Sequence, residues 1–192
     1  MSLADNAANV NRLLAAAAET IGKVRYCWLL SATAEGGIRP RPMGRVPRDA
    51  DEDEWTLRFI TDGRSPKVAD MRRVGQVSVI FQDDPDEAFI ALAGKASLVE
   101  GKSEFGRRWM AYYDSFFPAG SDRSNAVFIT IDVARVELWI RGVTPEPFGL
   151  RTTVIERDAA RCWHLKADLP SGLFAAATAI RSRLVGRVPW IR

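Results

Sequence analysis

The segment 61–67, Thr-Asp-Gly-Arg-Ser-Pro-Lys, follows an apolar run typical of a strand and precedes a run typical of a short helix. Ser65 predicts the N-cap of this helix and Pro66 its first residue. Lys67 then lies in the first turn, where the helix dipole disfavours a cation. This placement indicates a bound anion, held by Lys67, by the hydroxyls of Ser65 and Thr61 and by free backbone N–H groups. An ordinary capped helix with a solvated lysine is the alternative.

The composition indicates one soluble domain with a sizeable core, because 47% of the 192 residues are hydrophobic and 27% are charged. The formal net charge of +3 fits a small anionic ligand about as well as a nucleic acid. The sequence contains no motif typical of nucleic-acid-binding proteins, so we expect no nucleic-acid partner. The sequence contains no signal peptide and no run long enough to span a membrane, which predicts a cytoplasmic protein without a membrane span.

Cysteine and histidine are scarce. Cys27 and Cys162 are each flanked by large apolar residues, which predicts two buried thiols in a reducing compartment. His164 is the only histidine. We therefore expect no metal site, and neither a Ser-His-Asp nor a Cys-His catalytic device.

The sequence pattern predicts a mostly β protein. A helix over residues 3–21 should end at Gly22. Strands are predicted over 24–32 (buried), 38–46 (irregular or at an edge), 55–61, 76–81, 88–100 (with a bulge at Gly94), 126–132 and 134–140. One further helix is predicted over 104–117. Six or seven strands with few helices and short turns indicate a closed or nearly closed antiparallel barrel.

The character of the sequence changes after Gly142. Residues 144–147 are typical of a connector, residues 152–155 and 162–165 of a strand pair, and residues 171–184 of a helix. We therefore predict a barrel domain over 1–144 and an extension over 145–192. The arginines near the C-terminus leave contact with a membrane or an anionic partner open. Packing of this helix on the barrel or on a neighbouring subunit is the favoured interpretation.

Several motifs together resemble the FMN-binding split barrel of the pyridoxamine 5′-phosphate oxidase superfamily, and in particular its general stress protein branch. They are Arg41-Pro42-Met43, Thr61, Ser65-Pro66-Lys67, Phe81, residues 88–94, Phe-Phe-Pro-Ala-Gly at 116–120 and Val-Glu-Leu-Trp at 136–139. The resemblance covers about residues 8–142. It implies a six- or seven-stranded antiparallel split β-barrel with peripheral helices.

The resemblance also implies a homodimer that binds FMN between its subunits. The residues that match the cofactor-binding pattern are Arg41, Pro42, Met43, Ile60, Thr61, Ser65, Lys67 and, from the partner subunit, Trp139. A tryptophan in the barrel core is an equal interpretation of Trp139. Pro66 replaces an arginine of the oxidase, so phosphate binding should rest more on Arg41 and Lys67, with Arg64 as a further candidate.

Three departures concern the substrate and the flavin. The oxidase carries an Arg-x-His element after the tryptophan, whereas residues 140–145 contain no histidine. Arg45 occupies the region where the oxidase has a lysine, and it is not an equivalent point charge. Phe89 matches a glutamine that bonds the flavin, and it cannot donate a hydrogen bond. We therefore do not expect vitamin B6 oxidation.

The sequence is compatible with three hypotheses for the function. The first hypothesis is a redox-active FMN flavoprotein in which the flavin supplies the chemistry, with a deazaflavin or FAD as the alternative cofactor. No residue is assigned as catalytic. The second hypothesis is a non-enzymatic flavin store, sensor or scavenger, and the third is a deazaflavin-dependent reductase on the same barrel. Haem ligation is not expected, because the single histidine lies in the extension.

Overall fold

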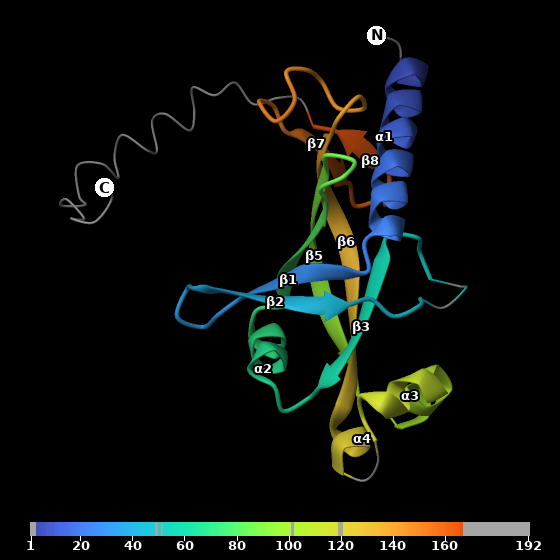
Figure 1. The fold of residues 1–192 in the computed structure, drawn as a ribbon. Coiled ribbons are helices and arrows are strands. Elements are labelled where there is room, and N and C mark those ends of the chain that lie inside the picture. The colour runs from blue at the N-terminus through green and yellow to red at the C-terminus, as the bar shows by residue number, and fades with distance from the viewer. Residues whose placement is uncertain (1–2, 49, 51, 101, 119–120, 167–192) are drawn as a thin grey trace, which may run out of the picture.

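The computed structural model describes residues 3–48, 50, 52–100, 102–118 and 121–166. In this part of the chain, eight strands form one antiparallel sheet in the order β2-β1-β4-β5-β6-β7-β8, and β3 pairs with β6 (Figure 1). The strands are β1 (Tyr26–Ala32), β2 (Ile38–Gly44), β3 (Thr56–Asp62), β4 (Gln76–Asp83), β5 (Ala88–Val99), β6 (Ala126–Ile140), β7 (Thr153–Arg157) and β8 (Trp163–Leu165). The predicted mostly β, antiparallel class is confirmed: β1–β6 lie within the predicted barrel region, and β7 and β8 lie in the predicted extension.

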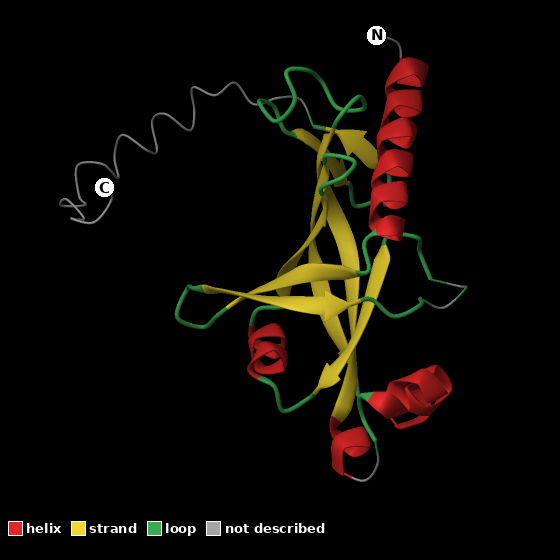
Figure 2. Cartoon of the chain, viewed as in Figure 1, coloured by secondary structure: helices red, strands yellow, loops and turns green. Residues whose placement is uncertain are grey.

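Helices lie around this sheet (Figure 2). They are α1 (Leu3–Lys23), α2 (Pro66–Arg73), α3 (Lys102–Arg108), the 3-10 helix η1 (Ala111–Ser115) and α4 (Ser121–Asn125). The described part of the chain contains no helix with the length and apolar character needed to cross a bilayer. Helix α2 connects β3 to β4 and is tied to β1 by the hydrogen bond between Ser31 Oγ and Asp70 Oδ2, 3.4 Å.

The core lies between α1 and the inner face of the sheet. Leu13 and Ala17 of α1 are buried together with Phe59, Phe81 and Ile90 from three strands. Burial of such side chains supplies most of the folding free energy. Helix α1 continues to Lys23, beyond the predicted end at Ile21, so Gly22 lies inside the helix.

Strand β6 is one strand of 15 residues, where the sequence pattern predicts two. The register skips Ala134 next to Gly94, so the predicted break is a β-bulge. The predicted bulge at Gly94 is confirmed. Strand β6 pairs with β3 over its first half and with β7 over its second half, and the bulge lies between the two halves. A bulge bends the strand that contains it, so the two halves of β6 can run in different directions.

Gly94→Ala is expected to lower the free energy of unfolding by about 2 kcal/mol. A Cβ at this position would lie 2.2 Å from the backbone oxygen of Asp132, which cannot move without opening the bulge. Gly22→Ala is the control, because a Cβ there meets nothing within 4 Å and alanine favours a helix. Chemical denaturation of both variants measures the difference. Equal stabilities would show that the bulge tolerates a side chain.

Three local predictions are wrong. Strand β1 is not buried on both sides: Tyr26 and Trp28 are 60% and 49% exposed and alternate with buried Cys27 and Leu29. Cys162 is exposed, whereas Cys27 is buried as predicted. The predicted helix over 104–117 is two short helices, because Met110 between them has extended backbone (φ −118°, ψ 144°).

The predicted strand pair in the extension is confirmed as β7 and β8. Strand β7 also pairs with β6, so these residues continue the barrel sheet. Arg157 of β7 donates two hydrogen bonds to Asp53, at 2.9 and 2.8 Å, and Trp55 packs edge-on against Trp163 at 5.4 Å. The predicted helix over 171–184 lies outside the described residues.

Candidate functional site

Residues of β2 and α2 bring two cations together at the start of α2. Ser65 is the N-cap and Pro66 the first helical residue, as predicted. The Ser65 side chain makes no capping hydrogen bond, and its Oγ is buried with no partner among the described residues. An orphaned buried hydroxyl is costly, so it indicates a polar ligand at this point.

Arg41 of β2 and Lys67 of α2 are both partly buried. Burial lowers the pKa of the Lys67 ammonium, the charge of Arg41 lowers it further, and Asp62 opposes this. Burial also lowers the pKa of the Arg41 guanidinium, with Asp70 opposing and Arg39 adding to the effect. Arg41 donates to Ser31 Oγ (3.0 Å) and to the backbone oxygen of Arg39 (2.9 Å). No ion pair of Arg41 or Lys67 with a described carboxylate is found within 4 Å. Two desolvated cations with mutual repulsion favour an anion between them.

The expectation of free backbone N–H groups holds only in part, because the N–H of Lys67 has no partner among the described residues but those of the loop before it are engaged. The N–H of Arg64 donates to Asp62 Oδ1 (2.8 Å) and the N–H of Ser65 donates to the Asp62 backbone oxygen (3.1 Å). Asp62 also holds the Arg64 guanidinium, and this interaction lowers the pKa of Asp62 to about 2. Arg64 is therefore engaged by Asp62, and the side chains of Ser65, Lys67 and Arg41, with the N–H of Lys67, remain as candidate anion-binding groups.

Lys67→Met is expected to stabilise the ligand-free protein at neutral pH. A lysine with a lowered folded-state pKa binds its proton less tightly when folded, so its charge costs stability below that pKa. The cost disappears as pH rises through the folded-state pKa towards the ordinary value of 10.5. The difference in free energy of unfolding between variant and parent should therefore shrink between pH 7 and pH 11. A difference that is constant over this range would show that Lys67 carries no electrostatic penalty.

A cavity of about 450 Å³ is lined by residues that lie close in the sequence to Arg41, Ser65 and Lys67. Its lining includes four predicted cofactor-binding residues, Pro42, Met43, Ile60 and Thr61. Pro42 directly follows Arg41, and Thr61 lies four residues before Ser65. The structure therefore brings these four residues together at one cavity, and it places the two cations and Ser65 on the adjoining segments.

Arg45 lines the same cavity but performs a structural role. Its guanidinium donates to the backbone oxygen of Ile21 (2.6 Å) near the end of α1 and lies over the Phe81 ring at 5.4 Å. Carbonyls in the last turn of a helix lack partners within the helix, so a cation there stabilises it. These contacts hold the Arg45 side chain against α1 and β4, so they do not indicate that it takes the role of the lysine that the oxidase has in this region.

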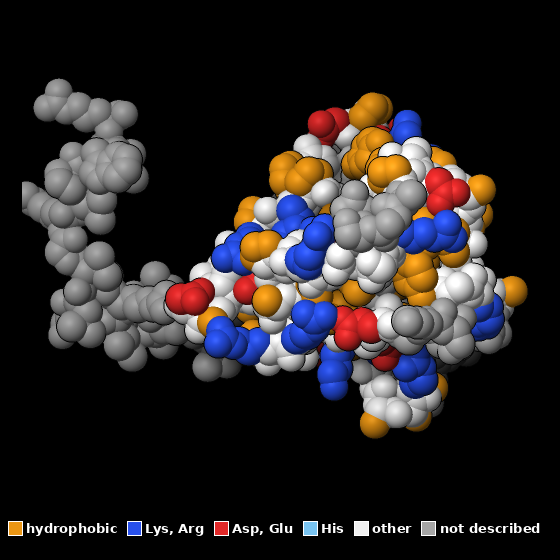
Figure 3. Space-filling view, turned by 90° about the horizontal axis from the view of Figure 1, so that it is seen from below, with side chains coloured by type: hydrophobic (Ala, Val, Ile, Leu, Met, Phe, Trp, Pro, Cys, Tyr) orange, Lys and Arg blue, Asp and Glu red, His pale blue; other side chains and the backbone are white. Residues whose placement is uncertain are grey.

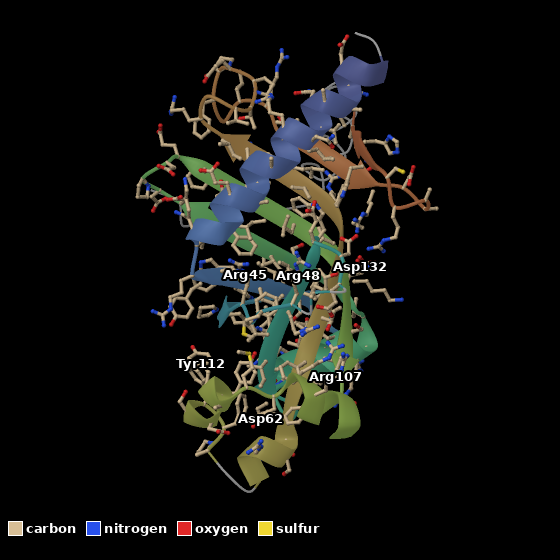
Figure 4. The ribbon with its side chains drawn as sticks, turned by 90° about the vertical axis from the view of Figure 1, so that its right-hand side faces the viewer. Arg45, Arg48, Asp62, Arg107, Tyr112 and Asp132 are labelled. Carbon is tan, nitrogen blue, oxygen red and sulfur yellow. The ribbon has the colours of Figure 1, made fainter. Side chains whose placement is uncertain are left out.

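Aromatic side chains form a further part of the cavity lining that the sequence pattern did not predict. Tyr112, Tyr113, Phe116 and Phe117 come from η1 and the residues after it, and Tyr26 comes from β1. Figure 4 shows Tyr112, Asp62 and Arg45, which belong to η1, to β3 and to the residue after β2. The motif at 116–120 served only for the resemblance. Alternation along β1 would have placed Tyr26 and Trp28 outward, opposite to Cys27.

A family model described as pyridoxamine 5′-phosphate oxidase like matches residues 14–146. The chain belongs to this pyridoxamine 5′-phosphate oxidase-like family. The resemblance inferred from the motifs is thereby confirmed. No curated protein matches the sequence.

Solved structures show the same fold. An FMN-binding, pyridoxamine 5′-phosphate oxidase-related protein of Nostoc punctiforme is 17% identical, with 82% of this chain and 95% of that chain covered and a TM-score of 0.62. A Clostridium acetobutylicum protein related to general stress protein 26 is 14% identical, with 77% and 95% covered and a TM-score of 0.60. PhzG of Burkholderia lata, solved with tetrahydrophenazine-1-carboxylic acid, is 17% identical, with 84% and 90% covered and a TM-score of 0.59.

Trp139 is the one predicted cofactor-binding residue that the chain does not bring to this site. Thr61 pairs with Val127, and Trp139 lies twelve residues further along β6. At about 3.3 Å per residue this is a separation of at most roughly 40 Å along the strand. Trp139 instead pairs with Phe89, whose ring packs near Phe148 at 6.4 Å. Trp139 is partly exposed and lies near the C-terminal end of β6.

Proposed function

We propose that this chain is a homodimeric flavoprotein that binds FMN at the cavity and at the start of α2. The observation that carries the proposal is the buried, orphaned Ser65 Oγ beside two partly buried cations, Arg41 and Lys67. A phosphate dianion would accept hydrogen bonds from all three groups and offset the repulsion of the two charges. The flavin ring would lie along Pro42, Met43 and Thr61. These residues lie close in the sequence to Arg41 and Ser65, which would bind the phosphate.

The surface supports an anionic ligand at this end of the molecule. Figure 3 views the molecule from below and shows basic and hydrophobic side chains over this face, with fewer acidic ones. An excess of basic over acidic side chains attracts anions to this face of the molecule. FMN, when bound, would supply electron or hydride transfer, and this chain would bind it, orient it and exclude water.

The homodimer is supported by Trp139 and by an exposed apolar surface. A second copy could bring its Trp139 to the flavin, whereas Trp139 of the same chain lies twelve residues along β6 from Val127, the partner of Thr61. Tyr26, Trp28 and Ile38 on the β1–β2 hairpin are 60%, 49% and 70% exposed. Tyr26 and Trp28 lie two residues apart on one face of β1, and Ile38 lies further along the hairpin, opposite Ala32. Exposed apolar side chains that gather on one surface commonly mark an interface.

A non-enzymatic flavin binder is the second candidate function. Asp62 is the one carboxylate among the described residues that line the cavity, and Arg64 holds it ionised with a pKa of about 2. It is therefore a poor proton donor at neutral pH. An FMN-dependent oxidoreductase would have to rely on the flavin itself. Reduction of the bound flavin by NADH or NADPH, with turnover, distinguishes the two.

Protein purified from a flavin-rich host tests the proposal. We expect flavin absorbance bands in the folded protein, release of the chromophore on denaturation, and the mass of FMN for the released molecule. Light scattering at micromolar concentration should give twice the chain mass of 21.3 kDa. A protein that is colourless and does not take up added FMN would contradict flavin binding, and a monomer would contradict the interface site.

A further inference from the structure

The Arg41 side chain is held by groups that are not among the proposed contacts of the phosphate. Its Nη2 donates to Ser31 Oγ of β1 (3.0 Å) and to the backbone oxygen of Arg39 (2.9 Å). Among the described residues, no further group accepts a hydrogen bond from its guanidinium. A guanidinium carries five N–H donors in a planar fork, so Nε and Nη1 of Arg41 stay available for a ligand.

Ser31 is held in turn by a carboxylate of α2. Ser31 is 2% exposed, and its hydroxyl donates to Asp70 Oδ2 (3.4 Å). A hydroxyl that donates its proton to a carboxylate presents its lone pairs to other donors, and Ser31 accepts from Arg41 in this way. The Asp70 carboxylate also pairs with Arg39 Nη1 (2.8 Å). Asp70, Ser31 and Arg41 therefore form a chain of hydrogen bonds from α2 through β1 to β2, which we call the Asp70 relay.

The Asp70 relay joins the two parts of the candidate phosphate site. Ser65 and Lys67 lie at the start of α2, and Asp70 lies on the same helix, one turn after Lys67. Arg41 comes from β2, which is the edge strand of the sheet and pairs with β1. The relay is thus a side-chain link between the helix that carries one part of the site and the edge strand that carries the other.

The carboxylate of the relay has two opposing effects on a bound anion. An acidic side chain close to a phosphate repels it, but the charge of Asp70 is compensated by Arg39, and its side chain is only 12% exposed. A free arginine loses rotamer entropy when it binds a ligand, and an arginine already held in place loses less. We therefore expect the positioning of Arg41 to outweigh the repulsion by Asp70.

We propose that Asp70 and Ser31 are positioning residues that hold the Arg41 guanidinium for the flavin phosphate, so that an acidic residue strengthens the binding of an anion. This inference rests on the proposed function, because Arg41 would act on the phosphate of FMN. Its consequence is opposite to that of charge alone. Truncation of Asp70 makes the site more positive, and the relay predicts that FMN nevertheless binds more weakly.

The test compares the dissociation constants of FMN and riboflavin, measured by fluorescence titration of the apoprotein and its variants. Ser31→Ala and Asp70→Ala should each lose about tenfold in affinity for FMN and keep their affinity for riboflavin within about threefold. Asp70→Asn retains an oxygen that accepts from Ser31, so it should bind FMN at least as tightly as the parent. In an Arg41→Ala background, Ser31→Ala should cause no further loss, because it acts only through Arg41.

Ser78→Ala is the matched control. Ser78 lies on β4 opposite Leu30, is partly buried, and its hydroxyl makes no hydrogen bond to any described residue. Its variant should bind both flavins as the parent does.

Three results would overturn the proposal. They are unchanged FMN affinity in Ser31→Ala, tighter FMN binding in Asp70→Ala, and an equal loss of riboflavin affinity, which would assign the two residues to the stability of the fold. A parent that binds no FMN would refute the proposed function. A parent whose preference for FMN over riboflavin survives in both alanine variants would refute this inference alone.

Discussion

Replacing both Arg41 and Lys67 by alanine is expected to weaken FMN binding by about three orders of magnitude. Each hydrogen bond to a charged group contributes about 1.5–3 kcal/mol, so each single variant should lose about 10–100-fold in affinity. Neither residue has a carboxylate partner among the described residues within 4 Å, so the loss should come from the ligand and not from a broken ion pair. Flavin fluorescence titration of the apoprotein measures it.

Arg73→Ala is the control for this experiment. Arg73 lies on the same helix as Lys67, is exposed and is in the last turn, so its removal changes the net charge equally without touching the start of the helix. FMN affinity within about threefold of the parent is expected, because exposed charges are screened by solvent and salt. If the Arg41 and Lys67 variants also stay within this range, the phosphate lies elsewhere.

Glu52→Ala is expected to lower the free energy of unfolding by about 3 kcal/mol and Tm by roughly 6–12 °C. Glu52 accepts from Arg58 of β3, whose side chain is 3% exposed, and from Arg108 of α3 at 3.5 Å. Its removal leaves the Arg58 charge buried with less compensation. Because η1 follows α3 in the chain, the same change should loosen the aromatic residues of the cavity lining that η1 carries, Tyr112 and Tyr113.

Glu54→Ala tests whether this effect belongs to the buried pair. Glu54 lies in the same loop, is exposed, and accepts only a hydrogen bond from Trp55 Nε1 among the contacts found for the described residues (2.9 Å). Its loss should cost about 1 kcal/mol or less. Adding Arg58→Met to Glu52→Ala should restore part of the stability, because the uncompensated charge is removed. Strictly additive losses in the double variant would contradict the coupling.

Local chemistry made the start of α2 predictable from sequence. The N-cap at Ser65 and proline at the first helical position depend only on neighbouring residues, and both are confirmed. The engagement of the loop N–H groups was missed, although Asp62 followed by glycine is a common way to fold an aspartate onto its own backbone. The orphaned Ser65 hydroxyl could not be predicted, because it depends on which groups the fold leaves out of reach.

Predictions that depend on long-range contacts were weaker. Alternation alone could not show that β6 continues through Ala134, because the bulge is set by the close approach of Gly94 to the Asp132 backbone. The role of Arg45 depends on where α1 ends in space. The break at Met110 lets Trp109 and Tyr113 pack as an aromatic pair, and helical periodicity does not contain that information.

The central claim is that this chain recognises a flavin through its phosphate. The most direct test is the ratio of the dissociation constants of the parent apoprotein for riboflavin and for FMN, measured in the same buffer without phosphate. The two ligands differ only in the phosphate, so the site at Ser65, Lys67 and Arg41 predicts at least about a 100-fold preference for FMN. Equal dissociation constants would contradict the account.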